Sequence, residues 1–265
     1  MARIEVAVAD GVAVLELNEP PANTYSHAMM RELDEAVLAA RMDPAVHVLV
    51  LIGAGERFFC AGADIGMLKD ADPTFKYYFC LHANETLTRL EQTPKLVIAA
   101  LNGHAVGGGF EVAMAADLRI ARKGAGKIGL PEVALGVLPG TGGTQRLARL
   151  VGKAKAMELM VTGALLTMEE GHAAGLVHQV WGEDVLAGRS FRDTVVDYAR
   201  TFTPPHRASR AVGHIKRAIQ SGLEASFAEG LALERELQQR LFESDDAAEG
   251  LAANLEKRPP RFSGR

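Results

Sequence analysis

The stretch Asn102-Gly103-His104-Ala105-Val106-Gly107-Gly108-Gly109-Phe110-Glu111 decides the fold that we expect for this chain. An apolar run, residues 96–101, precedes it and has the length of a strand buried on both faces. Helix-forming residues 110–116 follow, with Glu111 in the first turn or two. Because glycines have no side chains, they leave backbone N–H groups uncovered at the positively polarised start of that helix. We therefore predict a strand, a glycine-rich turn and a helix that can hold an oxyanion, with a carboxylate beside it.

Two further stretches support this prediction, the first with small residues and the second with a placed carboxylate. Residues 57–65 follow the apolar run 46–52 and bring small residues to positions 61–63, where backbone can approach a ligand closely. In residues 130–146, Glu132 follows a proline that cannot donate a hydrogen bond. A glycine-rich junction can be turn chemistry alone, and a glutamate near a helix start can be favourable electrostatics alone. Only the combination of the three stretches therefore predicts a catalytic site.

Local signals elsewhere predict the secondary structure. Residues 4–17 predict a hairpin with a two-residue turn at Asp10-Gly11. A helix is expected from Ser26 to the break at Asp43-Pro44, and another over residues 77–92. Residues 66–75 are expected to be irregular, either as a lid over the substrate or as a simple surface loop.

The order of these elements indicates the fold class. Strands and helices recur up to about Tyr198, and the chain is almost wholly helical beyond it. This order predicts an α/β protein. The C-terminal helices carry an apolar stripe that faces either a partner subunit or the chain's own core. Its residues are Phe227, Leu231, Leu237 and Leu241.

Composition excludes several classes of protein. The 265 residues are 48% hydrophobic and carry a net charge of −4, which gives no general attraction to nucleic acid or to an anionic membrane. Two cysteines are too few for a disulfide framework, and we expect Cys60 to be a small buried residue rather than a nucleophile. We find no targeting pattern and no apolar run near the roughly 20 residues of a membrane helix. We therefore expect a cytoplasmic protein with no metal, no membrane and no nucleic acid partner, in which His47 and His104 are structural.

The three stretches and two later segments resemble the crotonase, or enoyl-CoA hydratase/isomerase, superfamily, and within it the bacterial enoyl-CoA hydratases. The resemblance runs nearly end to end. It is carried, in chain order, by residues 60–65, 102–111, 131–146, 162–163 with 175–177, and 244–250 with 256–258. The chain departs from the family at Asn23-Thr24-Tyr25, where Asn-Ala-Leu is frequent, and at residues 66–80, so the resemblance leaves the acyl specificity open.

The resemblance implies a fold and an assembly. It implies the family's ββα spiral as a catalytic core over residues 1–200, rather than a doubly wound sheet. Residues 201–265 would form a C-terminal helical region that builds a homotrimer, commonly doubled to a hexamer.

It also implies a reaction, the addition of water to the double bond of a trans-2-enoyl-CoA, as in the β-oxidation of fatty acids. Negative charge develops on the thioester oxygen during this addition, and fixed N–H groups stabilise it. The resemblance places this oxyanion hole at the backbone N–H groups of Ala63 and Gly108. Two carboxyl groups in different protonation states can then activate water and protonate the α-carbon. We assign Glu111 as the base and Glu132 as the acid, although the two roles could be exchanged or shared.

Recognition of coenzyme A is expected at few residues. Arg57 and Lys257 match basic positions that the family places near the CoA moiety, with Lys257 reaching it from a neighbouring subunit; the alternative for both is a solvated surface charge. Ala61, Asp64 and Ile65, in the turn of Ala63, are expected to contact the substrate. Coenzyme A is part of the substrate, and no other cofactor is expected. The glycines of residues 140–143 do not form a dinucleotide-binding loop, because no Gly-x-Gly-x-x-Gly follows a strand there.

Three alternatives remain beside hydration. An enoyl-CoA isomerase is the second hypothesis, and other acyl-CoA chemistry of the superfamily uses the same oxyanion hole. A non-catalytic RNA-binding relative is disfavoured by the net charge and by the lack of a dense basic helix, to which the nearest approach is Arg207, Arg210, Lys216 and Arg217.

A pocket closed by Tyr77, Tyr78 or Phe79 would favour short acyl chains.

Overall fold

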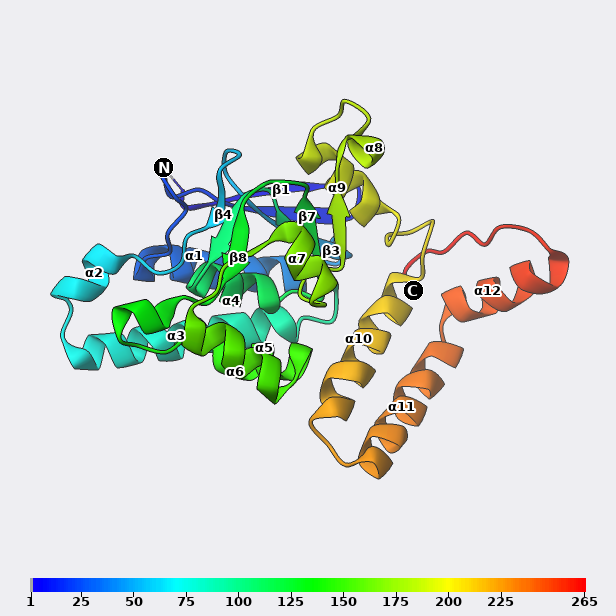
Figure 1. The fold of residues 1–265 in the computed structure, drawn as a ribbon. Helices are drawn as coiled ribbons and strands as arrows, with labels where there is room; N and C mark the ends of the chain where they lie inside the picture. Colours follow the sequence, from blue (N-terminus) through cyan, green and yellow to red (C-terminus); the bar gives the residue numbers. More distant parts are fainter. Residues whose placement is uncertain (1) are drawn as a thin grey trace.

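The computed structural model describes residues 2–265 and has a large sheet whose two faces are covered by helices (Figure 1). The strands of this sheet lie in the order β1-β2-β3-β5-β7-β10. The first pair is antiparallel, as the predicted hairpin requires, and all other neighbours are parallel. The strands are β1 (Ile4–Ala9), β2 (Val12–Leu17), β3 (Val48–Gly53), β5 (Leu96–Leu101), β7 (Leu118–Arg122) and β10 (Gln179–Trp181). The α/β class predicted from the sequence is confirmed.

A second, smaller sheet follows the first. Its strands lie in the order β4-β6-β8-β9, with the first three parallel. They are β4 (Phe58–Cys60), β6 (His104–Val106), β8 (Lys127–Gly129) and β9 (Leu166–Thr167). Each of β4, β6 and β8 directly follows a strand of the large sheet and precedes a helix. The chain therefore repeats a strand-strand-helix unit, and this repeat brings the three stretches singled out in the sequence to one place.

Helices cover both faces of the large sheet because β3 and β5 are buried along their whole length. On one face Leu49 and Val97 pack toward α1 and α3, and on the other Val50 and Ile98 pack toward α9. The helices of the core are α1 (His27–Met42), α2 (Ile65–Asp70), α3 (Pro73–Glu91), α4 (Gly108–Met114), α5 (Gly143–Val151), α6 (Lys153–Thr162), α7 (Met168–Ala173), α8 (Glu183–Leu186) and α9 (Phe191–Arg200), with a short 3-10 helix η1 (Glu132–Leu135).

Two local predictions are wrong. Residues 66–75 are not irregular, since α2 occupies much of them and α3 begins at Pro73. Asp64 and Asp72 cap these helices, with their carboxylates accepting from the N–H groups of Met67 at 3.1 Å and Phe75 at 2.9 Å. The stretch 102–111 is also more than a turn, because β6 lies inside it. A three-residue strand has no period that the sequence could show.

The C-terminal region consists of α10 (Ser209–Leu223), α11 (Phe227–Phe242) and α12 (Asp245–Glu256), and α11 and α12 lie away from the sheets (Figure 1). The buried ammonium of Lys216 joins α10 to the core, 2.8 Å from the Asp117 carboxylate. In the predicted stripe, Leu237 is buried but Phe227 is 83% exposed. Other large apolar residues exposed in this region are Ile215, Ile219, Leu223, Phe242, Leu251 and Leu255. Across residues 2–265, every helix is too short or too polar to cross a membrane.

Asn102 links the ends of two central strands, and its loss should weaken the fold. Its side chain accepts from the Gly53 N–H at 3.0 Å and donates to the carbonyls of Gly53 and Gly55 at 2.8 and 2.7 Å. We expect Asn102→Ala to lower the free energy of unfolding by about 2–4 kcal/mol, because it leaves buried backbone groups unpaired. Urea unfolding measures this. Asn18→Ala, which removes a bond to Glu5 at the surface, is the control and should cost less than about 0.5 kcal/mol; equal losses would contradict the assignment.

Candidate active site

Two glycine-containing turns pack against each other where β4 and β6 end. A Cβ atom on Gly109 would lie 2.0 Å from the Cys60 carbonyl oxygen, so the two backbones can approach this closely only without that side chain. A Cβ atom on Gly62 would lie 3.2 Å from the Gly108 nitrogen. The turn around Ala63 therefore lies beside the start of α4, as the pairing of β4 with β6 dictates.

These turns present two backbone N–H groups. Tyr25 fixes the first turn on either side of Ala63, because its N–H donates to the Gly62 carbonyl at 2.9 Å and its carbonyl accepts from the Asp64 N–H at 3.1 Å. Within residues 2–265, the N–H groups of Ala63 and Gly108 donate to no other group. An N–H at the first position of a helix has no partner inside the helix. The two turns thus offer two N–H donors without partners, and their role as an oxyanion hole stays a prediction.

Glu111 lies one helical turn further on and is only 1% exposed. Its Oε1 accepts from the N–H groups of Thr141 at 2.9 Å and Gly143 at 2.6 Å. Its Oε2 accepts from the Thr141 hydroxyl. Burial raises the pKa of Glu111, and these three donors together with the charge of Arg146 oppose that rise. The carboxylate is held on both oxygens, which leaves about one of its four lone-pair positions open.

Glu132 has the opposite surroundings. It begins η1 after Pro131, and its Oε1 lies 3.0 Å from where a Cβ atom on Gly107 would be, at the start of α4. Its Oε2 is buried without a hydrogen-bond partner in the described chain. Burial, with a smaller contribution from the charge of Glu111, raises the pKa of Glu132 to about 7. Two carboxyl groups in one site therefore differ in how readily they ionise, because one has three donors and the other has none at Oε2.

The other predicted residues divide into two groups. Ala61, Asp64 and Ile65 lie in the turn of Ala63, where Asp64 caps α2 and Ile65 is 54% exposed. The exposed Arg57 precedes β4, with its guanidinium 5.2 Å from the centre of the Phe58 ring. Lys257 is separate from all of these within one chain. It caps the carboxyl end of α12, which lies far from α4 (Figure 1).

The structure adds Tyr25 and Thr141, which the sequence analysis did not assign to the site. The Tyr25 side chain is 3% exposed, and its hydroxyl lies 3.3 Å from Thr141 Oγ1. The departure from the family pattern at residues 23–25 could have drawn attention to Tyr25. No local motif in the sequence distinguishes Thr141. Of the three aromatic residues predicted to close the pocket, Tyr77 and Tyr78 are exposed and only Phe79 faces inward, with its ring centre 5.8 Å from that of Tyr25.

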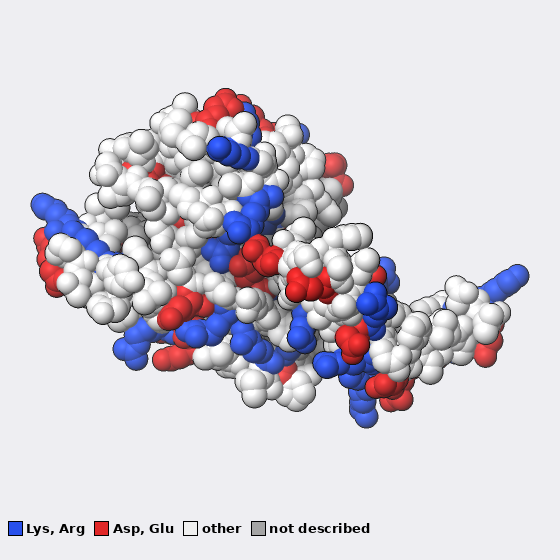
Figure 2. All heavy atoms as spheres, turned by 90° about the horizontal axis from the view of Figure 1, so that it is seen from below, with Lys and Arg blue, Asp and Glu red and all other residues white. Residues whose placement is uncertain are grey.

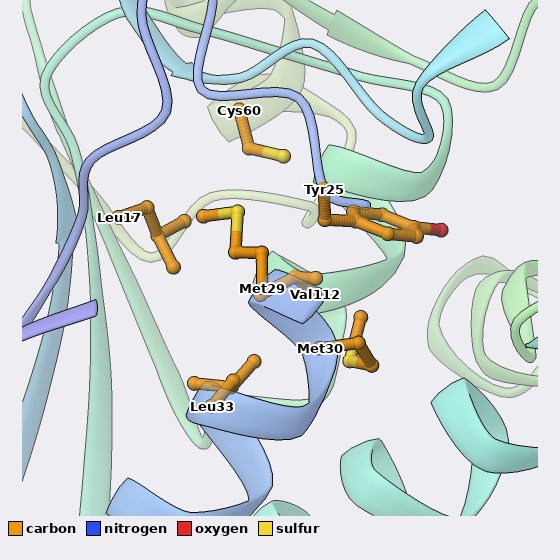
Figure 3. Close-up of a pocket in the computed structure, with 7 residues that line it drawn as sticks. All are labelled: Leu17, Tyr25, Met29, Met30, Leu33, Cys60 and Val112. Carbon is orange, nitrogen blue, oxygen red and sulfur yellow. The ribbon is translucent and has the colours of Figure 1, made fainter. Parts of the chain in front are cut away.

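A small apolar cavity lies behind the Tyr25 ring (Figure 3). Its volume is about 10 Å³, and the phenol oxygen of Tyr25 points away from it. The other lining residues are Leu17, Met29, Met30, Leu33, Cys60 and Val112. Cys60 is buried, as predicted, and burial raises the pKa of its thiol to about 12, which disfavours the thiolate.

This chain matches one family model and several known proteins. A family model described as Enoyl-CoA hydratase/isomerase matches residues 7–265. A probable enoyl-CoA hydratase of Rhizobium meliloti (strain 1021) is 40% identical over 96% of this chain and 95% of its own length. A short-chain-enoyl-CoA hydratase of Clostridium acetobutylicum is 37% identical over 93% and 92%.

Solved structures agree with these sequence matches. The crystal structure of an enoyl-CoA hydratase from Geobacillus kaustophilus HTA426 has a TM-score of 0.95 and 43% identity, and the match covers 100% of this chain and 98% of that one. Together with the repeated strand-strand-helix unit, this similarity confirms the spiral fold predicted from the sequence.

The raised pKa of Glu132 should appear in the stability of the protein. Between the ordinary value of 4.5 and about 7, the unfolded chain releases this proton while the folded chain keeps it. The contribution of the Glu132 carboxyl group to stability is therefore fully present below pH 4.5 and is lost as the pH rises to about 7. We expect Glu132→Gln, which does not titrate, to gain about 1–2 kcal/mol over the wild type across this window, after allowance for partial exposure. Urea unfolding at pH 4.5 and pH 8 measures this gain, and a difference independent of pH would contradict it.

Proposed function

This chain belongs to the enoyl-CoA hydratase/isomerase family, and on that basis we propose that it adds water to trans-2-enoyl-CoA thioesters to give 3-hydroxyacyl-CoA. One observation carries this proposal: Glu111 and Glu132 have contrasting surroundings and lie beside two N–H groups that have no partner within residues 2–265. Relatives named as enoyl-CoA hydratases at about 40% identity support it. The β-oxidation of fatty acids is the pathway that we propose for it.

The N–H groups of Ala63 and Gly108 would bind the thioester oxygen. When hydroxide character develops on the attacking water, electrons move from the double bond to that oxygen, and an enolate-like state forms. Fixed backbone donors stabilise this charge without rearranging, and one such donor contributes about 3 kcal/mol in comparable sites. The glycine turns hold both donors on rigid elements, since β4 and β6 are paired.

Glu111 would act as the base on water and Glu132 as the acid at the α-carbon. Glu111 receives three hydrogen bonds that favour its ionised form, so its open lone pair can accept a proton from water. Glu132, with a pKa raised to about 7, retains a proton that it can deliver to the α-carbon. Water loses one proton to Glu111 and bonds to the β-carbon, while the α-carbon gains one from Glu132. Return of a proton from Glu111 to Glu132 resets the site.

Recognition of the CoA portion would use the turn that carries Ala63. Arg57 lies on the surface before β4, where it can reach a phosphate, and Ala61, Asp64 and Ile65 line the turn itself. Because α12 lies far from α4 in one chain, Lys257 would take part only from a neighbouring copy. The thioester brings coenzyme A with it, and the proposed reaction needs no other cofactor.

Both glutamates should be required for hydration. We expect Glu111→Gln and Glu132→Gln each to lower kcat/KM for a short trans-2-enoyl-CoA by at least about a hundredfold, since each general acid or base step contributes 10² to 10⁴-fold. Loss of absorbance of the conjugated double bond follows the reaction. Glu85→Gln, on the exposed side of α3, is the matched control and should keep wild-type activity. Robust hydration by either glutamate variant would remove that residue from the mechanism.

Isomerisation of a 3-enoyl-CoA is the second candidate, because the family model is described by both activities. A single carboxyl group with a pKa of about 7, as at Glu132, is suited to move a proton between two carbons. Assaying a 3-enoyl-CoA beside the 2-enoyl-CoA separates the candidates. Faster isomerisation than hydration would replace the hydratase proposal.

An RNA-binding role has less support. On the face drawn in Figure 2, acidic and basic side chains are interspersed, and the net charge is −4. Such a surface lacks the continuous basic stripe that binds a phosphate backbone. Salt-sensitive retention of RNA, together with no turnover of any enoyl-CoA, would favour this role instead.

We further propose that residues 201–265 form an oligomerisation region that builds a trimer or a hexamer. Exposed apolar residues such as Phe227 at 83% and Leu255 at 84% would be costly to leave in water. Light scattering after size exclusion should give three or six chain masses. Phe227→Glu with Leu255→Glu should lower that mass, and Met42→Glu, at an exposed site on α1, should not. A wild type that runs as a single chain would contradict the proposal.

A further inference from the structure

Tyr25 contacts both glycine turns of the candidate site and the threonine that holds Glu111. Its backbone flanks Ala63 through hydrogen bonds to Gly62 and Asp64. Its side chain crosses α4 at Gly108, where a Cβ atom would lie only 2.1 Å from the phenol oxygen. One residue therefore lies against both residues that carry the proposed oxyanion donors, Ala63 and Gly108.

The phenol is also connected to the proposed base, Glu111, through the Thr141 hydroxyl. Its oxygen lies 3.3 Å from Thr141 Oγ1, and the Thr141 hydroxyl donates to Glu111 Oε2. A threonine hydroxyl has one proton, which is used on the carboxylate, so the phenol must be the donor to Thr141. Burial, and secondly the charge of Glu111, raises the pKa of Tyr25 well above its ordinary value, so the phenol keeps its proton at any working pH. The direction of the chain is fixed: Tyr25 donates to Thr141, and Thr141 donates to Glu111.

We propose that Tyr25 is a positioning residue, whose hydroxyl acts through Thr141 to hold the Glu111 carboxylate in one orientation and to favour its ionised form. The two backbone donors fix Oε1, while Oε2 depends on the Thr141 hydroxyl alone. Without the phenol, that hydroxyl is free to rotate away, because its other partner is gone. The carboxylate would then lose the donor on the oxygen that carries its open lone pair. The kinetic part of this inference rests on the proposed hydration.

Tyr25→Phe is the variant that tests the hydroxyl alone. The ring fills the space between the site and the apolar cavity of Figure 3, so a smaller residue would also change the packing. Phenylalanine keeps that packing and removes one oxygen. Tyr198→Phe is the matched control, because Tyr198 packs on the opposite face of the large sheet. In the part of the chain that the structure describes, its hydroxyl bonds only to Gln179, at 3.4 Å.

We expect Tyr25→Phe to lower kcat for hydration by about 3–10-fold with KM changed less than about twofold, as for loss of one indirect hydrogen bond. Thr141→Val should lower kcat by about 10–100-fold, since it removes the donor to the carboxylate itself, and Thr141→Ser should restore most of it. With fewer donors the ionised form of Glu111 is less favoured, and its pKa rises. The acid limb of the kcat profile should therefore move to higher pH in Tyr25→Phe and further in Thr141→Val.

A second measurement does not depend on activity. Carbon-13 NMR of labelled glutamate side chains, with the Glu111 signal assigned by its absence in Glu111→Gln, follows the titration of this carboxyl group directly. Its midpoint should lie at higher pH in Tyr25→Phe than in the wild type and in Tyr198→Phe. If the wild type hydrates no enoyl-CoA, the proposed function fails, but this titration still decides the role of Tyr25. An unchanged midpoint in Tyr25→Phe overturns the inference. So does a loss of kcat in Tyr25→Phe that is equal at all pH values, or a Thr141→Ser variant that is as slow as Thr141→Val.

Discussion

The close packing of two backbone turns is the constraint on which the site depends. Gly109 lies against the Cys60 carbonyl, at a distance that any side chain would prevent. This approach accompanies the pairing of β4 with β6, and it brings the turn of Ala63 beside the start of α4 at Gly108. Hydrophobic burial of β3 and β5 supplies the rigid sheet that holds both turns in place. Rigid donors are what makes such a site effective, since they need no rearrangement when charge develops.

Contrast between two carboxyl groups is the second feature of the site. Glu111 and Glu132 are the same residue type, and burial raises the pKa of each. They differ in their partners, because α5 begins beside Glu111 and brings it the N–H groups of Thr141 and Gly143, whereas no donor reaches Glu132 Oε2. Acid and base chemistry by one residue type requires this kind of difference in surroundings. The start of α5 is therefore as much a part of the site as α4.

Much of the fold followed from local signals. The turn at Asp10-Gly11 predicted the first hairpin, and Ser26 and Asp43 mark the two ends of α1, as expected. The residues 102–111, 60–65 and 131–146 were sufficient to indicate the family, which the comparisons confirm. Short elements were missed, namely β4, β6 and β8 and the capped helix α2, because three to six residues carry too little periodicity to be recognised without their neighbours.

The sequence by itself identified the candidate catalytic residues. The two glutamates, and the glycines that expose backbone N–H groups, stand in local motifs that can be recognised without the structure. Only the tertiary structure decided how these residues are supported. Tyr25 and Thr141 are 116 positions apart, and they meet because α5 docks against α4 while the segment after β2 runs beside the turn of Ala63. A hydrogen bond acts over about 3 Å, whereas sequence patterns report only on near neighbours along the chain. For that reason only the tertiary structure decides which groups donate hydrogen bonds to Glu111, and these donors influence how readily its carboxyl group ionises.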